Sequence, residues 1–444
     1  MYGSIFTSST SFSVAVTHTI ADQPRFRCID RLSNLPWDVL DSILVRIPLK
    51  EAVRTSVLST KWRLKWTGLS QYLIDDRIFP TGLVLDPVGR GDQVAGILHQ
   101  VQVNHNGPIE KFKFSAYCRL DHSVLLQWII FLGGRGVNEF LLERFDSPMP
   151  FEFPFDQFSC PKLRHLNLFC CTIKLPIVHA FEGFNHLTSL QLTEVSINTE
   201  TLECLIHKCS VLEKLTLLDL EFGDPIFLKI QNTKLRYLKI ISAIGDIILH
   251  DNPFLVSVEI RLRIPPIPNI LEQDSNLVRI FSSLQGIRRL ALSNFSVLFF
   301  SNGIIPEKLP CPLHNLTVVE LSEVSVDTLK QAMVCLSLIK SAPNLEELFI
   351  SVARPFTNGK FVTDFLSDKC RFGLYFNRLK VVKVRGVWEM DHAWHFVKFI
   401  LANSPVLETL TIVSLRDGRF TEEQLAQLDR ASERVKILSL TACS

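Results

Sequence analysis

The feature that most constrains the fold of this chain is a group of three apolar residues, at positions i, i+3 and i+5, that recurs thirteen times. The first positions of successive groups lie 20 to 34 residues apart. The last two apolar residues of each group alternate with other residues, which is the period of a short strand with one buried face. The thirteen groups are Ile109/Phe112/Phe114, Val137/Phe140/Leu142, Leu163/Leu166/Leu168, Leu187/Leu190/Leu192, Leu212/Leu215/Leu217, Leu235/Leu238/Ile240, Leu255/Val258/Ile260, Ile287/Leu290/Leu292, Leu316/Val319/Leu321, Leu345/Leu348/Ile350, Leu379/Val382/Val384, Leu407/Leu410/Ile412 and Val435/Leu438/Leu440.

Between these groups the apolar spacing changes to that of a helix. For example, Leu202, Leu205, Ile206 and Cys209 lie at i, i+3, i+4 and i+7. A strand and a return segment that repeat every ~20–29 residues are typical of a leucine-rich repeat, and most of these units fit that length. Stacked units of this kind form a curved solenoid whose strands line one face. We therefore predict an α/β fold dominated by a leucine-rich-repeat solenoid.

The outward residues of each predicted strand have no role in the core, so binding specificity is expected there. They include the basic residues Lys111, Lys113, Lys214, Lys239, Arg261, Arg289, Lys383 and Arg385, the acids Glu139, Glu143, Glu259, Glu320 and Glu347, and the aromatics Phe169, Tyr237 and Phe349. Mixed charge with a few aromatic anchors suits a protein partner, whereas a polyanion would favour one sign. The predicted substrate-binding residues are Phe169, Tyr237, Lys239, Arg261, Arg289 and Phe349. Since the three cations of this set fall on successive units, a local anion pocket is an alternative to a solvated face.

The N-terminal part of the chain lacks the repeat. Residues 1–28 are rich in Ser and Thr, hold the single acid Asp22, and have no Arg before Arg25. We expect a disordered tail there, with a targeting segment as the alternative.

The stretch from Asp30 to Asp75 has the spacing of three short helices. The first begins near Pro36, the second after Pro48, and the third carries Trp62 and Trp66. The first helix has one apolar face, formed by Leu40, Ile43, Leu44 and Ile47. So small a unit buries little by itself, and its apolar residues are divided between its own core and a partner surface.

Residues 30–66 resemble the F-box, particularly the form seen in plants. The matching features are Leu35-Pro36, Ile43-Leu44, Ala52-Val53-Arg54, Val57-Leu58-Ser59 and the tryptophans Trp62 and Trp66. The region from about Cys370 onward resembles the FBD module through Leu379-Lys380-Val381-Val382, Gly386, Phe396-Val397-Lys398-Phe399, Asn403, Pro405 and Leu407-Glu408. With the repeats between them, the chain after residue 28 resembles an F-box/FBD/LRR-repeat protein.

This resemblance implies a role in ubiquitin ligases of the SCF (Skp–cullin–F-box) type. The F-box would dock onto a Skp-type adaptor, which is attached to a cullin, and the repeats would bind a substrate protein. Carried over from the family, the adaptor-binding residues are Leu35, Pro36, Leu40, Ile43, Leu44, Pro48, Val57 and Leu58. The implied organisation is a tail (1–28), an F-box (29–75), a linker or first repeat cap (76–108), leucine-rich repeats (109–369) and an FBD region that continues the repeats (370–444).

Composition and missing motifs exclude other classes. A net charge of +2 among 444 residues is too small for wholesale binding of nucleic acid or an anionic membrane. No apolar run reaches the ~18 residues that a membrane span requires. Eleven cysteines without a CxxC pair indicate reduced thiols in the cytosol or nucleus. Neither zinc-type spacing nor a catalytic motif is present, so we expect no metal, no cofactor and no enzymatic activity.

The sequence therefore predicts a non-catalytic subunit that recognises the substrates of a cullin-based ubiquitin ligase. Two alternatives stay open, namely a repeat scaffold that does not promote degradation and a small-ligand receptor of the F-box/LRR type. The sequence names neither the substrate nor the pathway.

Overall fold

The computed structural model describes residues 32–79, 86–144, 150–175, 184–222, 227–250, 252–265, 275–324, 329–352, 376–386, 392–414, 425 and 428–441. The predicted N-terminal tail (1–28) and the expected start of the FBD region at Cys370 lie outside these residues.

The dominant element of the described chain is one parallel sheet of fourteen strands, arranged almost in sequence order. All thirteen predicted strands are present, and one further strand, β1, precedes them and pairs with β2. The strands, in sheet order, are β1 (Gln71–Ile74), β2 (Lys111–Phe114), β3 (Glu139–Glu143), β5 (His165–Phe169), β7 (Ser189–Thr193), β9 (Lys214–Leu218), β11 (Tyr237–Ser242), β13 (Ser257–Leu262), β14 (Arg289–Ser293), β15 (Val318–Val324), β16 (Glu347–Val352), β17 (Val381–Arg385), β18 (Thr409–Ser414) and β19 (Lys436–Thr441).

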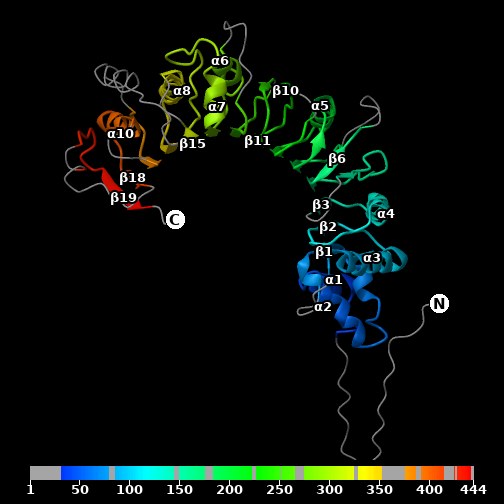
Figure 1. Ribbon diagram of the computed structural model, residues 1–444. Coiled ribbons are helices and arrows are strands. Elements are labelled where there is room, and N and C mark those ends of the chain that lie inside the picture. The colour runs from blue at the N-terminus through cyan, green and yellow to red at the C-terminus, as the bar shows by residue number, and fades with distance from the viewer. Residues whose placement is uncertain are drawn as a thin grey trace, which may run out of the picture.

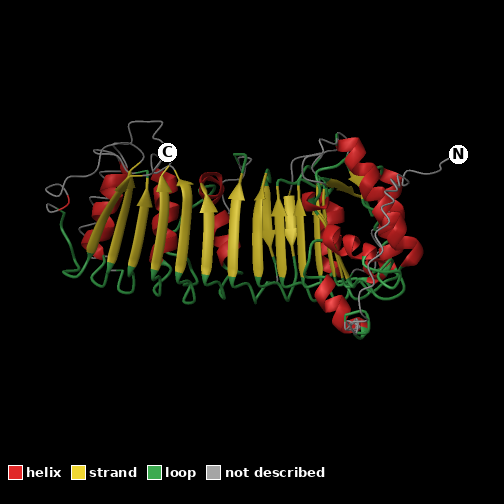
Figure 2. Cartoon of the chain, turned by 90° about the horizontal axis from the view of Figure 1, so that it is seen from below, coloured by secondary structure: helices red, strands yellow, loops and turns green. Residues whose placement is uncertain are grey.

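The strands line the inner side of an open arc (Figure 1). Seen from below, they run side by side in one direction along the whole arc (Figure 2). Alternate residues of each strand point into the solenoid, as Leu238 and Ile240 of β11 do, while Tyr237 and Lys239 face outward. One continuous cluster of buried apolar side chains extends from Leu40 to Val435. The predicted curved solenoid is thus confirmed, since each unit buries its apolar face only against its neighbours.

Helices and two small sheets form the outer side of the arc (Figure 1). The helical spacing predicted from Leu202 to Cys209 is confirmed by α5, and all four apolar residues of that stretch are buried. Within the described residues, the α-helices that follow β1 are α3 (Pro87–Asn104), α4 (His122–Gly133), α5 (Thr199–Lys208), α6 (Asn276–Phe281), α7 (Asn294–Phe300), α8 (Leu329–Lys340) and α10 (His392–Asn403). The small sheets contain β4 (Phe151–Glu152), β6 (Cys171–Ile173) and β8 (Ser196–Ile197), and β10 (Phe227–Ile230) and β12 (Asp246–Leu249).

The N-terminal unit contains α1 (Trp37–Leu44), α2 (Leu49–Arg54) and the 3₁₀ helices η1 (Thr55–Val57), η2 (Lys65–Gly68) and η3 (Asp76–Ile78). The third predicted helix, around the two tryptophans, is therefore a series of turns that ends in a 3₁₀ helix. Tertiary contacts determine its shape, because Trp62 Nε1 donates to Ser33 Oγ at 2.7 Å and Tyr72 Oη donates to the Thr67 carbonyl at 2.6 Å. Packing of this kind overrides local helix propensity.

A polar joint connects this unit to the solenoid. The Asp41 carboxylate of α1 accepts hydrogen bonds from Ser70 N at 2.9 Å and Ser70 Oγ at 2.5 Å, directly before β1. Tyr72 of β1 lies against the buried ring of His105, whose Nδ1 is 2.8 Å from the Thr67 carbonyl. The helical unit is therefore fixed to the first strand of the sheet rather than tethered by a free linker.

The last strand differs from the prediction in register. Ile437 and Ser439 take the inward positions of β19, opposite Leu410 and Ile412, whereas Leu438 and Leu440 face outward and are about half exposed. The turn before β19 is one residue shorter than the turn before β18. At β19 only the amide of Lys436 donates to the Glu408 carbonyl of the preceding unit. In the unit before it, the amides of Glu408 and Thr409 both donate to the Lys380 carbonyl. A shift of one residue moves every side chain of a strand to the opposite face.

Candidate functional site

Two surfaces of the described chain combine exposed side chains in a way that suits a protein partner. The first is the N-terminal apolar surface, which is formed by large exposed apolar side chains before and in α1, between α1 and α2, and in and after η1. Val57 and Leu58 are its most exposed members, at 86% and 64%. Its residues are Leu32, Trp37, Val39, Ile43, Ile47, Val57, Leu58 and Leu64. So many exposed apolar residues in so short a unit suit contact with a partner.

The structure divides the eight predicted adaptor-binding residues into two buried, one half-buried and five exposed residues. Leu40 and Leu44 are core residues, at 1% and 3% exposure, so their side chains support α1 and are not available to a partner. Leu35 is half-buried against the same core. The remaining five are exposed, namely Pro36, Ile43, Pro48, Val57 and Leu58.

Several residues of the N-terminal apolar surface were not singled out from the sequence. Trp37, Val39 and Leu64 are exposed beside the predicted residues. Val39 and Ile43 lie at i and i+4, next to the buried stripe of Leu40 and Leu44, so α1 has two adjacent apolar faces. A unit of this size buries only one of them, and the second face was the available signal.

A pocket next to this surface is basic. It is lined by Trp37 and Leu64, which belong to the N-terminal apolar surface, by residues near the end of α3, and by Lys61, Arg63 and Lys65. None of its lining residues carries a carboxylate. Acidic side chains of a partner would therefore complement this edge of the surface.

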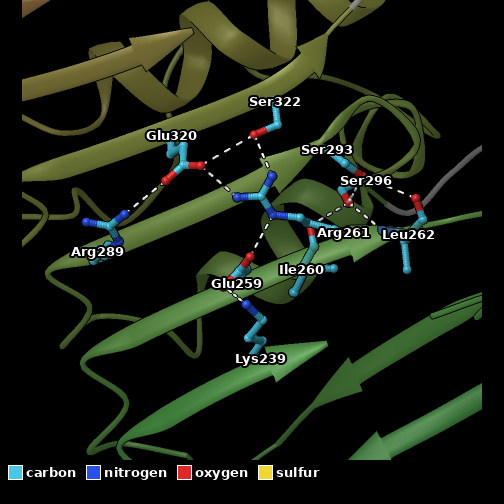
Figure 3. A network of polar contacts seen from close by, with 10 residues as sticks. All are labelled: Lys239, Glu259, Ile260, Arg261, Leu262, Arg289, Ser293, Ser296, Glu320 and Ser322. Atoms are coloured by element: carbon cyan, nitrogen blue, oxygen red, sulfur yellow. Dashed lines mark hydrogen bonds and ion pairs between the residues drawn. The ribbon is translucent and has the colours of Figure 1, made fainter. Parts of the chain in front are cut away.

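The second surface is the concave ion cluster, which lies on the outward face of β11 to β15 (Figure 3). Arg261 of β13 is its centre and contacts one residue of its own strand and two residues of β15. Its Nε is 2.6 Å from Glu259 Oε1, its Nη2 is 2.6 Å from Glu320 Oε1, and its Nη1 donates to Ser322 Oγ at 2.6 Å. Glu320 is 59 residues away in the sequence. Parallel stacking of successive units makes this contact possible.

Two further cations complete the cluster. Lys239 Nζ lies 3.1 Å from Glu259 Oε2, and Arg289 Nη2 lies 2.9 Å from Glu320 Oε2. Burial raises the pKa of Glu259, but the hydrogen bonds and charges of Lys239 and Arg261 more than offset this effect, so that its pKa lies below the usual range. Three cations thus share two carboxylates, which leaves little charge for a polyanion. A polyanion that binds at these three cations would therefore have to displace Glu259 and Glu320 from their ion pairs.

The structure places all six predicted substrate-binding residues on the concave face, but it does not bring all of them together. Lys239, Arg261 and Arg289 meet through shared carboxylates, and Phe349 of β16 lies in register with Glu320 of β15. Tyr237 is 46% exposed on the same strand as Lys239. Phe169, in β5, is separated from β11 by two strands.

Four buried cysteines of the described chain are poorly suited to a transfer reaction that requires a thiolate. Burial raises the pKa of the Cys160, Cys171 and Cys335 thiols to about 12 and that of Cys209 to about 11. Among the described residues, no group of three or more His, Cys, Asp or Glu side chains is arranged to hold a metal ion. No helix in the described part of the chain is long and apolar enough to cross a membrane.

Comparison with known proteins agrees with this architecture. Residues 32–73 match the F-box domain, residues 125–350 match the LRR repeats of the FBD-associated F-box protein At5g56370, and residues 376–412 match the FBD. The chain is 30% identical over 420 residues to the F-box/FBD/LRR-repeat protein At1g13570 of Arabidopsis thaliana, covering 93% of this chain and 98% of the relative. It is 26% identical over 468 residues to the FBD-associated F-box protein At1g66310 of the same plant, covering 93% and 96%.

The fold and these matches define the class of protein in which an F-box is fused to a leucine-rich-repeat solenoid. F-box domains generally bind Skp1-type adaptors, leucine-rich repeats generally bind substrates, and proteins of this class are generally non-catalytic. The chain belongs to the F-box/FBD/LRR-repeat protein family.

Proposed function

We propose that this chain is the substrate-recognition subunit of an SCF ubiquitin ligase. Its F-box, for which we propose the bounds 29–75, docks onto a Skp-type adaptor that is joined to a cullin. The repeats (109–369) and the FBD region (370–444) then hold a substrate protein in the cytosol or nucleus. The observation that carries the proposal is the N-terminal apolar surface, which the chain leaves exposed beside a complete core.

The adaptor contact is proposed for the exposed residues of this surface. Pro36, Ile43, Pro48, Val57 and Leu58 would be buried by the adaptor, with Leu35 at the edge of the contact. Leu40 and Leu44 hold α1 in place from inside. The basic pocket beside Trp37 adds a complementary site for acidic residues of the adaptor. Such charge pairs would affect the orientation and the rate of adaptor association more than its affinity.

The polar joint supports a role in positioning. Since Asp41 is hydrogen-bonded to Ser70, and Tyr72 to Thr67, a substrate on the concave face would be held at a set place relative to the adaptor. A fixed geometry raises the effective concentration of a substrate lysine near activated ubiquitin. The chemistry itself would belong to the other subunits of the ligase.

Substrate contact is proposed for the outward residues of the concave face. Aromatic side chains and arginines carry most of the energy of typical interfaces. On that basis the anchors are Phe169, Tyr237, Lys239, Arg261, Arg289 and Phe349.

The test is reconstitution with the full chain. We expect the purified chain to form a stable complex with a Skp-type adaptor, to recruit a cullin through it, and to support ubiquitination of a protein bound to the repeats. The double variant Ile43→Asp with Val57→Asp should lose the adaptor and the cullin together while its partners on the repeats remain bound. Binding of the adaptor without ubiquitination of any bound protein would favour a scaffold, and retention of the adaptor by the variant would refute the docking assignment.

A further inference from the structure

Strand β17 presents two exposed cations in succession on the concave face; β2 also carries two outward lysines, but Lys111 there is ion-paired with Glu139. Lys383 and Arg385 occupy its outward positions, and both are exposed. No outward neighbour in register with them carries a charge. On β16 these neighbours are Phe349 and Ser351, and on β18 they are Thr411 and Val413.

These two cations contrast with those of the concave ion cluster. Lys239, Arg261 and Arg289 each lie within 3.1 Å of a carboxylate oxygen. Within the described residues, neither Lys383 nor Arg385 forms an ion pair. The acidic outward residue of β16 is Glu347, and it is in register with Val381 rather than with either cation.

We propose that the outward face of β16 to β18, here called the β17 cationic site, binds an acidic peptide segment of the substrate protein. The proposal rests on the function proposed above and specifies the chemistry of its substrate. The ligand would combine two carboxylates with a neighbouring apolar side chain.

Each part of the β17 cationic site has a counterpart in such a ligand. The Arg385 guanidinium accepts a carboxylate in a bidentate arrangement, and the Lys383 ammonium binds a second one as a point charge. The two residues lie two positions apart on the same face of the strand, which separates them by about 6.6 Å. Side chains on one face of an extended peptide repeat at the same distance. The half-buried ring of Phe349 provides an apolar contact beside Lys383, and the hydroxyls of Ser351 and Thr411 supply further donors.

The cost of binding also favours this site over the concave ion cluster. A carboxylate that approaches Lys239 or Arg289 must compete with Glu259 or Glu320, which already hold those cations. At β17 no such exchange is needed, so a carboxylate can pair with either cation without displacing an existing partner.

The test uses the full chain bound to its adaptor and a fluorescently labelled peptide of alternating glutamate and leucine. A matched peptide with lysine in place of glutamate serves as the ligand control. Fluorescence polarisation should show binding of the glutamate peptide only, with an affinity that falls as salt increases. The variant Lys383→Gln with Arg385→Gln should weaken binding about tenfold, as expected for loss of charge-assisted contacts.

The matched control variant is Lys208→Gln with Lys330→Gln, which removes the same charge from exposed positions of α5 and α8 on the outer side of the arc (Figure 1). It should leave the affinity for the glutamate peptide within about twofold of the wild-type value, because neither lysine lies on the concave face. Equal losses in both variants, no loss at Lys383 and Arg385, or equal binding of the lysine peptide would overturn the proposal. Adaptor binding is measured on the same samples. Failure of the proposed function would show as absence of adaptor binding, whereas failure of the β17 cationic site would show in the peptide affinities while the adaptor stays bound.

Discussion

Truncation of Val57 and Leu58 to alanine should separate docking of the adaptor from stability of the fold. The two side chains are 86% and 64% exposed, so together they offer about one and a half side chains to a partner. Complete burial of a Val or Leu side chain contributes about 1.5–3 kcal/mol. Their loss from a fully buried contact should therefore cost roughly 2–4 kcal/mol, which raises the Kd for the adaptor about 30- to 1,000-fold.

The assay is isothermal titration of the purified adaptor into wild-type and variant chains, with urea unfolding measured in parallel. The double variant should unfold within about 0.5 kcal/mol of the wild type, as exposed substitutions usually do. Leu40→Ala is the contrasting control, because Leu40 is 1% exposed and its truncation should cost about 2–5 kcal/mol of stability. If the folded double variant binds the adaptor with unchanged Kd, these two residues do not belong to the interface.

Three further predictions address packing, charge and chemistry. Gly91→Ala should destabilise the chain by about 1–3 kcal/mol, because the added Cβ would lie 2.0 Å from a main-chain carbonyl oxygen. Gly96→Ala in the same helix meets nothing within 4 Å and should stabilise the chain by about 0.5–1 kcal/mol. Urea unfolding measures both free energies, and equal effects of the two variants would contradict the described packing. Because the pKa of Glu259 is lowered in the folded state, its ion pairs stabilise the fold fully above the ordinary pKa of 4.5 and lose this effect as the pH falls through the folded-state pKa. Glu259→Gln should therefore cost about 1 kcal/mol of unfolding free energy at neutral pH. Unfolding measured at a series of acidic pH values should show that this cost disappears. Supplied with activated ubiquitin and a conjugating enzyme but no cullin complex, the chain should transfer no ubiquitin, because thiols such as Cys171 and Cys335 keep their protons; robust autoubiquitination would disprove this.

The sequence by itself determined the positions of thirteen strands and the class of fold. Two apolar positions alternate with polar ones in each unit, and only one stacking arrangement buries all of these apolar faces at once. It also determined where the N-terminal unit lies and that its apolar residues exceed what a small core can hold. It did not determine which of them face outward, since Leu40 and Ile43 have the same character and differ only in what packs against α1.

Only the tertiary structure decided three further points. The register of β19 depends on a turn one residue shorter, and the apolar pattern around Leu438 is compatible with either face. The pairing of Arg261 with Glu320 spans one intervening strand, β14, and 59 residues of the chain, a separation that no local sequence pattern reports. The difference between paired and unpaired cations follows from the same cause. Lys239 and Lys383 are both outward lysines in the sequence, and the stacked neighbours of each determine whether its charge is compensated.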